Sequence, residues 1–300
     1  MPPKEGIMSC RSLKLFIPFA LLLLLLGACS RPAKVLQPQA RINADATLEL
    51  AQNLEQKGHF RDSRQAFISA RSQYRSFGEI NGQCYALGGL ARLAYLEGET
   101  EEYNALRGEL WYLIQNAEPK LVYLHKLLDI YTAEDRKDYQ AVMALAQDEY
   151  DYPLEIRIQM LSHHLQAESY LQPAFESPNY VHLKRLAERY RGVLRRRHHA
   201  HATVLSTAEY ALAYHSYLLQ NYKVADKHID RAIDLDYRYE IFDGLAAAYW
   251  LKGSILEKLN EPRTALSFYF KARDIFADKA NSDMQRDLDA SIKRLQGDNE

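Results

Sequence analysis

The chain of 300 residues carries 38 Lys and Arg against 39 Asp and Glu, and 47% of its residues are hydrophobic. This balance of charge excludes a general nucleic-acid binder, which needs a strongly basic surface. The chain is long enough to bury a hydrophobic core, and its 3 cysteines are too few for a disulfide framework to replace one.

A short apolar run lies close to the N-terminus. Residues 15–26 are apolar apart from Pro18, and these 12 residues fall well short of the roughly 20 that cross a bilayer as a helix. Lys4, Arg11 and Lys14 precede the run, with a single acidic residue among them. A basic region followed by a short apolar region is typical of a secretory signal peptide, so we expect no transmembrane helix here.

Residues 26–29, with the sequence LGAC, resemble the lipobox of bacterial lipoproteins. The resemblance implies that a signal peptide of residues 1–28 is removed and that Cys29 is acylated. Each buried methylene contributes about 0.8 kcal/mol, so two or three acyl chains hold a protein at a membrane. In such lipoproteins an aspartate directly after the cysteine tends to retain the protein at the inner membrane. This position is Ser30 here, so the resemblance implies the outer membrane. The alternative is an ordinary signal peptide with a cysteine at its cleavage point.

Residues 29–43 are predicted to form a flexible tether between the lipid and the folded domain, because they contain Pro32 and Pro38 and no sustained periodicity. Signal removal and acylation of Cys29 would leave Cys84 as the remaining cysteine, so no intramolecular disulfide is expected. Cys84 stands among small apolar residues, which predicts a buried and unreactive thiol.

Beyond residue 44 apolar residues recur at spacings of three and four, which is typical of helices, and the pattern itself repeats. Near the C-terminus it places an aromatic, a small, a large, an alanine, an aromatic and an alanine residue at Tyr249, Gly253, Leu256, Ala265, Tyr269 and Ala272. This stretch resembles a tetratricopeptide repeat, which usually spans 34 residues. The first and fifth copies match it in part, with small residues at Ala51 and Ala213.

One position of the repeat can be followed along the whole chain. It is the small-residue position of the second helix, and its occupants are Ser63, Tyr103, Val142, Leu183, Ala225 and Ala265. The resemblance and this series together predict an all-α, right-handed α-solenoid of about six helix pairs over residues 44–300. Longer helices or longer turns must absorb the excess over 34 residues. An apolar stripe then predicts a C-terminal capping helix, at Met284, Leu288, Ile292 and Leu295.

In tetratricopeptide-repeat proteins, which this chain resembles, the first helix of each pair lines a concave groove. The positions carried over to this chain are Tyr85, Arg92, Tyr95, Tyr131, Tyr210, Tyr214, Tyr217 and Trp250. Tyrosine combines a broad apolar ring with a polar tip, which suits a protein-binding surface. The spacing of the three tyrosines at 210, 214 and 217 places them on one helix face. The alternative is that these rings pack between helices and contact no ligand.

A basic run at residues 189–202 carries five arginines and three histidines. Its guanidinium groups are suited to a phosphate-bearing surface such as lipid headgroups or lipopolysaccharide. The candidate anion-binding residues are Arg191, Arg195, Arg196 and Arg197. The alternative is a solvated helix end whose arginines complement the helix dipole.

The histidines suggest no metal site. His198 and His201 lie three residues apart, and His163 and His164 precede Glu168, but no third ligand stands at a recognised spacing. The sequence has no glycine-rich phosphate loop, nucleophile elbow or paired-histidine protease motif. We therefore expect no metal, no cofactor and no enzyme activity.

These features predict a lipid-anchored scaffold that holds an envelope protein or peptide in its groove, at the periplasmic face of the outer membrane. The resemblance to tetratricopeptide lipoproteins of the cell envelope implies a role in outer-membrane, pilus or cell-wall assembly. No nucleic-acid partner is expected. The alternative function is the binding of an envelope polyanion, either lipid or lipopolysaccharide.

Overall fold

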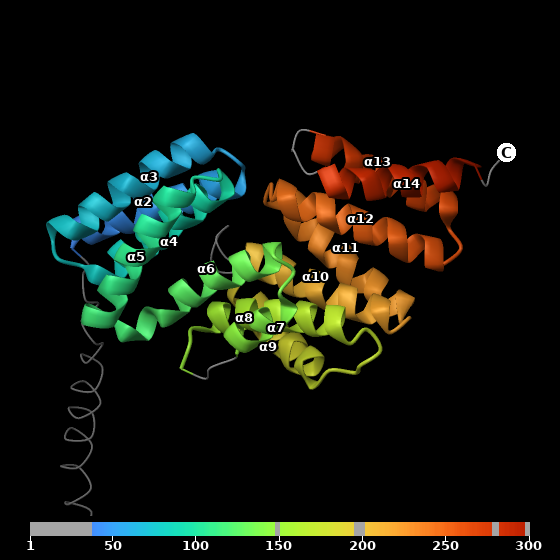
Figure 1. Ribbon diagram of the computed structural model, residues 1–300, viewed down its shortest axis with the longest axis horizontal. Coiled ribbons are helices and arrows are strands. Elements are labelled where there is room, and N and C mark those ends of the chain that lie inside the picture. Colours follow the sequence, from blue (N-terminus) through green and yellow to red (C-terminus); the bar gives the residue numbers. More distant parts are fainter. Residues whose placement is uncertain (1–37, 148–150, 195–201, 278–281, 298–300) are drawn as a thin grey trace, which may run out of the picture. The chain divides into compact units, whose positions relative to one another are not determined.

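The computed structural model describes residues 38–147, 151–194, 202–277 and 282–297 (Figure 1). The chain divides into two units, Met1–Gln39 and Ala40–Glu300. The described helices belong to the second unit, and the first of them starts at Gln39. The expected signal peptide and Cys29 lie outside the described residues. Within those residues, no helix has the length and the apolar character that a bilayer span requires.

Every regular element within the described ranges is a helix, and the helices follow one another as pairs (Figure 1). The first three pairs are α2 (Gln39–Gln56) with α3 (Phe60–Ser76), α4 (Ile80–Leu96) with α5 (Thr100–Ala117), and α6 (Val122–Asp135) with α7 (Tyr139–Leu145). The last three are α8 (Leu154–Leu171) with α9 (Pro178–Leu194), α10 (Ala202–Leu218) with α11 (Tyr222–Arg238), and α12 (Phe242–Lys258) with α13 (Pro262–Ala277). A short 3-10 helix, η1 (Pro119–Leu121), precedes α6, and α14 (Ser282–Gly297) follows the last pair.

Each pair packs on the next, so the all-α solenoid of six helix pairs that the sequence predicts is confirmed. The final helix, α14, covers the last pair as a cap. Leu288, Ile292 and Leu295 are buried against the core of α12 and α13. Arg294 of α14 also bonds to the carboxylate of Glu257 on α12 at 2.6 Å.

The solenoid begins earlier than the sequence indicated. Helix α2 starts at Gln39, so residues 39–43 are helical, whereas the tether was expected to extend to residue 43. The first turn of α2 has partners that favour the helix: Arg41 lies 3.8 Å from the carboxylate of Glu79, and Ala44 is fully buried. These contacts outweigh the lack of apolar periodicity that suggested a tether.

The repeat position followed along the sequence falls on the second helix of every pair, and all six occupants are buried, with 7% exposure or less. A small residue there brings the helices together, as at Ser63, whose hydroxyl donates to the carbonyl of Ala51 at 2.8 Å. Larger residues stand at this position in the second, third and fourth pairs. In these pairs the core is built from bulkier side chains, such as Leu110, Ile130 and Met160.

Close packing at two glycines brings aromatic rings onto the helix backbone. A Cβ atom added to Gly253 would lie 2.5 Å from the ring of Tyr269, and one added to Gly89 would lie 2.3 Å from the ring of Phe67. No larger residue fits without moving the ring. Phe67 belongs to the first pair and Gly89 to the second, so this contact also joins two repeats.

A common turn closes five of the six pairs. One residue with positive φ ends the first helix, and the occupants of this position are Gly58, Gly98, Lys137, Gln220 and Asn260. The next amide reaches back five residues, as in the bond of 2.9 Å from Glu261 N to the carbonyl of Leu256, which is the Schellman arrangement. Successive occupants of the repeat position stand 39 to 42 residues apart. The helices of the last two pairs have 16 or 17 residues, so helix length accounts for most of this spacing.

Candidate binding groove

A cavity of about 880 Å³ runs along the first helices of all six pairs, and we call it the central groove. It is lined by Leu48 and Glu55 of α2, Tyr85, Arg92 and Tyr95 of α4, Tyr131, Glu134 and Asp135 of α6, Glu155, Ile156, His163 and Tyr170 of α8, Thr203, Ser206 and Tyr210 of α10, and Gly244 and Ala247 of α12. Asp236 of α11 and Ile241 complete the wall near the last pair. A cavity of this size accommodates a peptide segment or a drug-sized molecule.

The structure divides the predicted groove residues into two groups. Five of them line the central groove, namely Tyr85, Arg92, Tyr95, Tyr131 and Tyr210. The other three take part in packing between side chains: Tyr214 lies 5.1 Å from the ring of Tyr170, Tyr217 lies 5.8 Å from the ring of Tyr222, and Trp250 packs against the core of the last pair. The two alternatives raised by the sequence therefore each describe part of the set.

Polar contacts fix the groove tyrosines. The hydroxyl groups of Tyr85 and Tyr123 lie 2.6 Å apart, and the hydroxyl of Tyr95 donates to the carboxylate of Asp135. Burial raises the pKa of both Tyr85 and Tyr95, and the Asp135 carboxylate raises that of Tyr95 further. These phenols therefore stay neutral and hold their rings in place as a preformed surface.

A stack of four tyrosine rings connects the groove lining with the side-chain packing next to it. Tyr139 stacks on Tyr170 with their ring centroids 4.4 Å apart, Tyr170 contacts Tyr214 at 5.1 Å, and Tyr214 lies parallel to Tyr210 at 6.5 Å. Sequence reasoning missed Tyr139 and Tyr170. Tyr139 is the first residue of α7, a second helix, and the rule that first helices line the groove does not reach it. Tyr170 lies on a first helix, α8, seven residues after the groove residue His163 and therefore on the same helix face, so its spacing was a usable signal.

One ion pair joins the first two pairs within the groove. The guanidinium of Arg92 binds both carboxylate oxygens of Glu55, with distances of 2.5 Å from Nε and from Nη2. Burial lowers the pKa of Arg92, and the Glu55 carboxylate more than offsets this, so the arginine stays charged. Arg92 therefore acts as a structural cation, and Glu55 neutralises it.

Carboxylates outnumber cations along the groove. Besides Glu55 the lining holds Glu134, Asp135, Glu155 and Asp236, whereas its only basic groups among the described residues are Arg92 and a histidine. That histidine is His163, whose Nδ1 lies 2.6 Å from Glu134. With Arg92 committed to Glu55, the groove presents a negative potential to any occupant.

Asp236 is the most unusual of these carboxylates. Its side chain is 1% exposed, it bonds to Ser206, and its Oδ1 atom has no hydrogen-bond partner among the described residues. The hydroxyl oxygen of Thr203 is buried and unpartnered in the same way. Burial raises the pKa of Asp236 to about 7. Gly244 makes room for it, because an added Cβ would lie 2.7 Å from a carboxylate oxygen.

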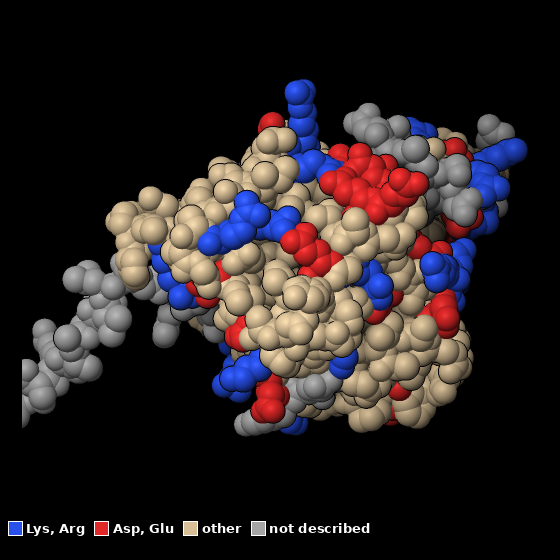
Figure 2. Space-filling view, turned by 60° about the vertical axis from the view of Figure 1, so that its left-hand side comes forward, with Lys and Arg blue, Asp and Glu red and all other residues tan. Residues whose placement is uncertain are grey.

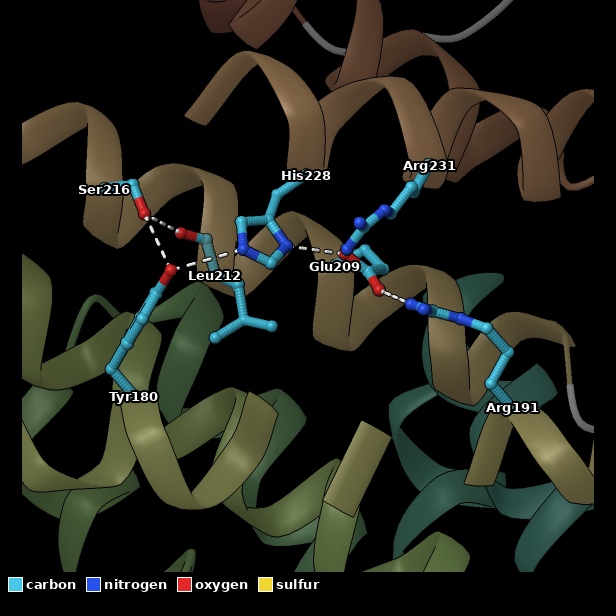
Figure 3. Close-up of polar contacts among 7 residues, drawn as sticks. All are labelled: Tyr180, Arg191, Glu209, Leu212, Ser216, His228 and Arg231. Atoms are coloured by element: carbon cyan, nitrogen blue, oxygen red, sulfur yellow. Dashed lines mark hydrogen bonds and ion pairs between the residues drawn. The ribbon is translucent and has the colours of Figure 1, made fainter. Parts of the chain in front are cut away.

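A buried polar network holds α10 in place behind this wall (Figure 3). Glu209, 1% exposed, receives the guanidinium of Arg191 from α9, and its other oxygen lies 2.6 Å from Nδ1 of His228 on α11. The second nitrogen of His228 lies 3.2 Å from the hydroxyl of Tyr180, which also bonds to Ser216. The network joins three helices and so orients Tyr210, the residue next to Glu209.

The basic run is described only in part. Arg191 is engaged with Glu209 inside the network, whereas Arg195, Arg196 and Arg197 lie outside the described residues. On the face drawn in Figure 2, Lys and Arg side chains form small groups interrupted by Asp and Glu, and the broadest group of one charge is acidic. The described residues on this face therefore form no extended basic surface for a polyanion.

The thiol of Cys84 and the carboxylate of Glu168 lie inside the packed fold. Cys84 is a buried free cysteine, and burial raises its pKa to about 11, so the thiol stays protonated. Glu168 accepts a hydrogen bond from Ser177. Within the described part of the chain, no group of three or more potential ligands is arranged to hold a metal ion.

Comparison with known proteins finds little. No protein-family model matches the chain, and no curated protein sequence matches it. Among solved structures it is similar to one described as the TPR2AB-domain:pHSP90-complex of yeast Sti1, at 17% sequence identity and a TM-score of 0.27, over 83% of this chain and 99% of that chain. At this identity and score the likeness carries no argument, so the fold assignment depends on the helix pairing itself.

Proposed function

We propose that this chain is a scaffold that binds a protein or peptide partner in the central groove. The observation that carries the proposal is the groove itself, which is continuous along six helix pairs and lined by tyrosines that are fixed before any ligand arrives. Pre-ordered aromatic side chains lose little conformational entropy on binding, which favours the capture of a partner in this groove.

Site-specific photocrosslinking in the native host tests this function. A photoreactive residue is placed at Tyr131 or at Tyr210, both in the groove, and at Tyr112, a 65% exposed position on α5, as the control. We expect one and the same protein to be captured at both groove positions and not at Tyr112, and the purified pair to bind directly. Capture at Tyr112 alone, or at none of the three positions, would contradict the proposal.

We further propose that an acylated Cys29 attaches this scaffold to the outer membrane, facing the periplasm, where it serves outer-membrane, pilus or cell-wall assembly. The support is the LGAC sequence of residues 26–29 behind a basic and apolar leader. Intact mass spectrometry of the membrane-extracted protein is expected to show acyl chains, and Cys29→Ser is expected to release the protein from the membrane fraction. Retention of this variant would refute the anchor.

Binding of an envelope polyanion is the weaker alternative. Its candidate residues are reduced to Arg195, Arg196 and Arg197, because Arg191 is engaged with Glu209. It predicts binding to anionic lipid vesicles that falls steeply with salt, since exposed charges are screened beyond about 8 Å at physiological ionic strength. Absent or salt-insensitive binding would remove it.

A further inference from the structure

We propose that the partner segment held in the central groove is basic, and that Asp236 and Thr203 form a subsite for one lysine or arginine side chain of that segment. This inference rests on the proposed scaffold function and adds the chemistry of the partner. The primary observation is a pair of buried oxygen atoms in the groove wall, Asp236 Oδ1 and Thr203 Oγ1, neither of which has a hydrogen-bond partner among the described residues.

Both oxygens can accept hydrogen bonds, and the carboxylate of an ionised Asp236 can only accept them. A buried acceptor without a donor is unfavourable, so a donor from another molecule would stabilise the wall at this point. An ammonium or guanidinium group supplies several donors and a compensating charge in one step. Of the described neighbours that wall the subsite, Ser206, Gly244 and Ala247 are all uncharged.

The space at Asp236 is built into the packing of the last two pairs. Gly244 on α12 is the residue that lets the carboxylate occupy the groove wall, because a Cβ there would lie 2.7 Å from Oδ2 and 3.0 Å from Oδ1. The helix before it contributes Asp236 from its last turn, on the face that carries the buried Ile229 and Ala232. An apolar residue at 236 would be cheaper to bury.

The rest of the groove favours the same partner. Glu134, Asp135 and Glu155 line it, whereas its one arginine is neutralised by Glu55. An extended basic segment would thus meet carboxylates along several helices. Tyr210 stands one helical turn after Ser206, on the same face of α10, where its ring offers a surface to the aliphatic part of a lysine or arginine.

The test uses the purified full-length chain in detergent and four fluorescent 12-residue peptides, each with six residues of one type, Lys, Arg, Gln or Glu, alternating with Ser and Gly. Binding is measured by anisotropy with the wild type, with Asp236→Asn, and with Asp234→Asn as the matched control. Asp234 belongs to the same helix but forms an exposed pair with Arg238. Circular dichroism verifies that each variant is folded.

We expect the Lys and Arg peptides to bind the wild type and Asp234→Asn with equal affinity, and Asp236→Asn to bind them about tenfold or more weakly. The Gln and Glu peptides should not bind. A photoreactive residue at Tyr210 should label the Lys peptide and lose that labelling in Asp236→Asn. Spermine is added as a competitor that carries the same charge without a polypeptide backbone.

Four outcomes would overturn the inference. Equal affinity of the Lys peptide for wild type and Asp236→Asn removes the subsite, and preference for the Glu peptide removes the basic partner. Tight binding of spermine without binding of the peptides assigns the site to a small polyamine instead. If groove photocrosslinking in the host captures a partner while the Lys and Arg peptides fail to bind, the scaffold function stands and the basic subsite falls.

Discussion

The first, fifth and sixth helix pairs differ from the third and fourth in how their two helices pack together. In the former, helices of 16 to 18 residues meet through the small residues Ser63, Ala225 and Ala265. In the latter, α7 has seven residues, α8 and α9 are joined by the longer connection of residues 172–177, and bulky side chains fill the core. Regular pairs depend on close backbone approach, whereas the middle pairs depend on side-chain volume and buried polar bonds.

The difference has a consequence for stability. Where small residues set the helix spacing, adding volume should be the damaging change. Where a buried polar network joins the irregular fourth pair to the regular fifth, removing charge should be the damaging change. Substitutions of the two kinds should therefore separate the regular pairs from the network.

The largest effect is expected at Glu209. Its replacement by alanine leaves the buried His228 and the partly exposed Arg191 without their shared carboxylate, and breaking a buried pair such as Glu209 with His228 costs about 3–5 kcal/mol. Urea unfolding followed by circular dichroism measures the free energy of unfolding. The control is Asp234→Ala, which removes an exposed ion pair and should cost about 0–1 kcal/mol. Similar losses in the two variants would show that the network does not stabilise the junction.

The next effect is a pH dependence at Asp236, a buried carboxyl group of the regular fifth pair. Its pKa is about 7 in the folded chain against 3.8 for an unperturbed aspartate. Between these values the unfolded chain releases the proton while the folded chain keeps it, so stability falls as pH rises from about 4 to about 7 and is level above that. The accumulated loss at pH 8 is up to about 4 kcal/mol.

Asp236→Asn is expected to abolish that decline, which unfolding measurements at pH 4, 6 and 8 would show as a flatter profile than the wild type. Asp234→Asn should keep the wild-type slope, because that residue is exposed. Parallel profiles for wild type and Asp236→Asn would mean that this carboxyl is not held in its neutral form. The same variant, if more stable above pH 7, would identify Asp236 as a residue that lowers the stability of the fold.

Added volume should be damaging in the sixth pair. Gly253→Ala places a Cβ about where the ring of Tyr269 lies, and such overpacking costs about 1–3 kcal/mol. Gly88→Ala is the matched control, because Gly88 lies inside α4 with no neighbouring atom within 4 Å of an added Cβ. That substitution should instead stabilise the helix by up to about 1 kcal/mol. The two variants must therefore differ in sign by urea unfolding, and a shared sign would refute the packing argument.

The fold could be read from the sequence because each pair needs one buried residue per period. That position stays visible at Val142 and Leu183, where the repeat pattern is otherwise lost, because burial is a local requirement. The start at Gln39 could not be read from the sequence, since it depends on tertiary contacts: the burial of Ala44 and the approach of Arg41 to Glu79, 38 residues away. The helical pattern of the first turn records no such contact.

The groove was foreseen in part. Tyr85, Tyr131 and Tyr210 follow from the rule that first helices face the groove. Asp236 does not, because it comes from a second helix and enters the wall only through the gap that Gly244 leaves. A signal was present: Asp236 stands seven residues after Ile229, on the buried face of α11, where a carboxylate is unexpected.

The smallest predicted effect concerns the turn that five pairs share. Glycine adopts positive φ without strain, yet Asn260 and Gln220 stand at this position in the regular fifth and sixth pairs, with φ of 61° each. Gln220→Gly should relieve the steric strain but loosen the unfolded chain, for a net gain of about 0.5 kcal/mol or less.

The reverse change, glycine to alanine, is available at the equivalent turn of the first pair. Gly58 has φ of 75° and no atom within 4 Å of an added Cβ, so Gly58→Ala meets no neighbour and suffers only backbone strain, about 1–2 kcal/mol. Differential scanning calorimetry should place its Tm several degrees below the wild type and that of Gln220→Gly at or slightly above it. An unchanged Tm for Gly58→Ala would mean that the turn itself, and with it the spacing of the regular pairs, tolerates rearrangement.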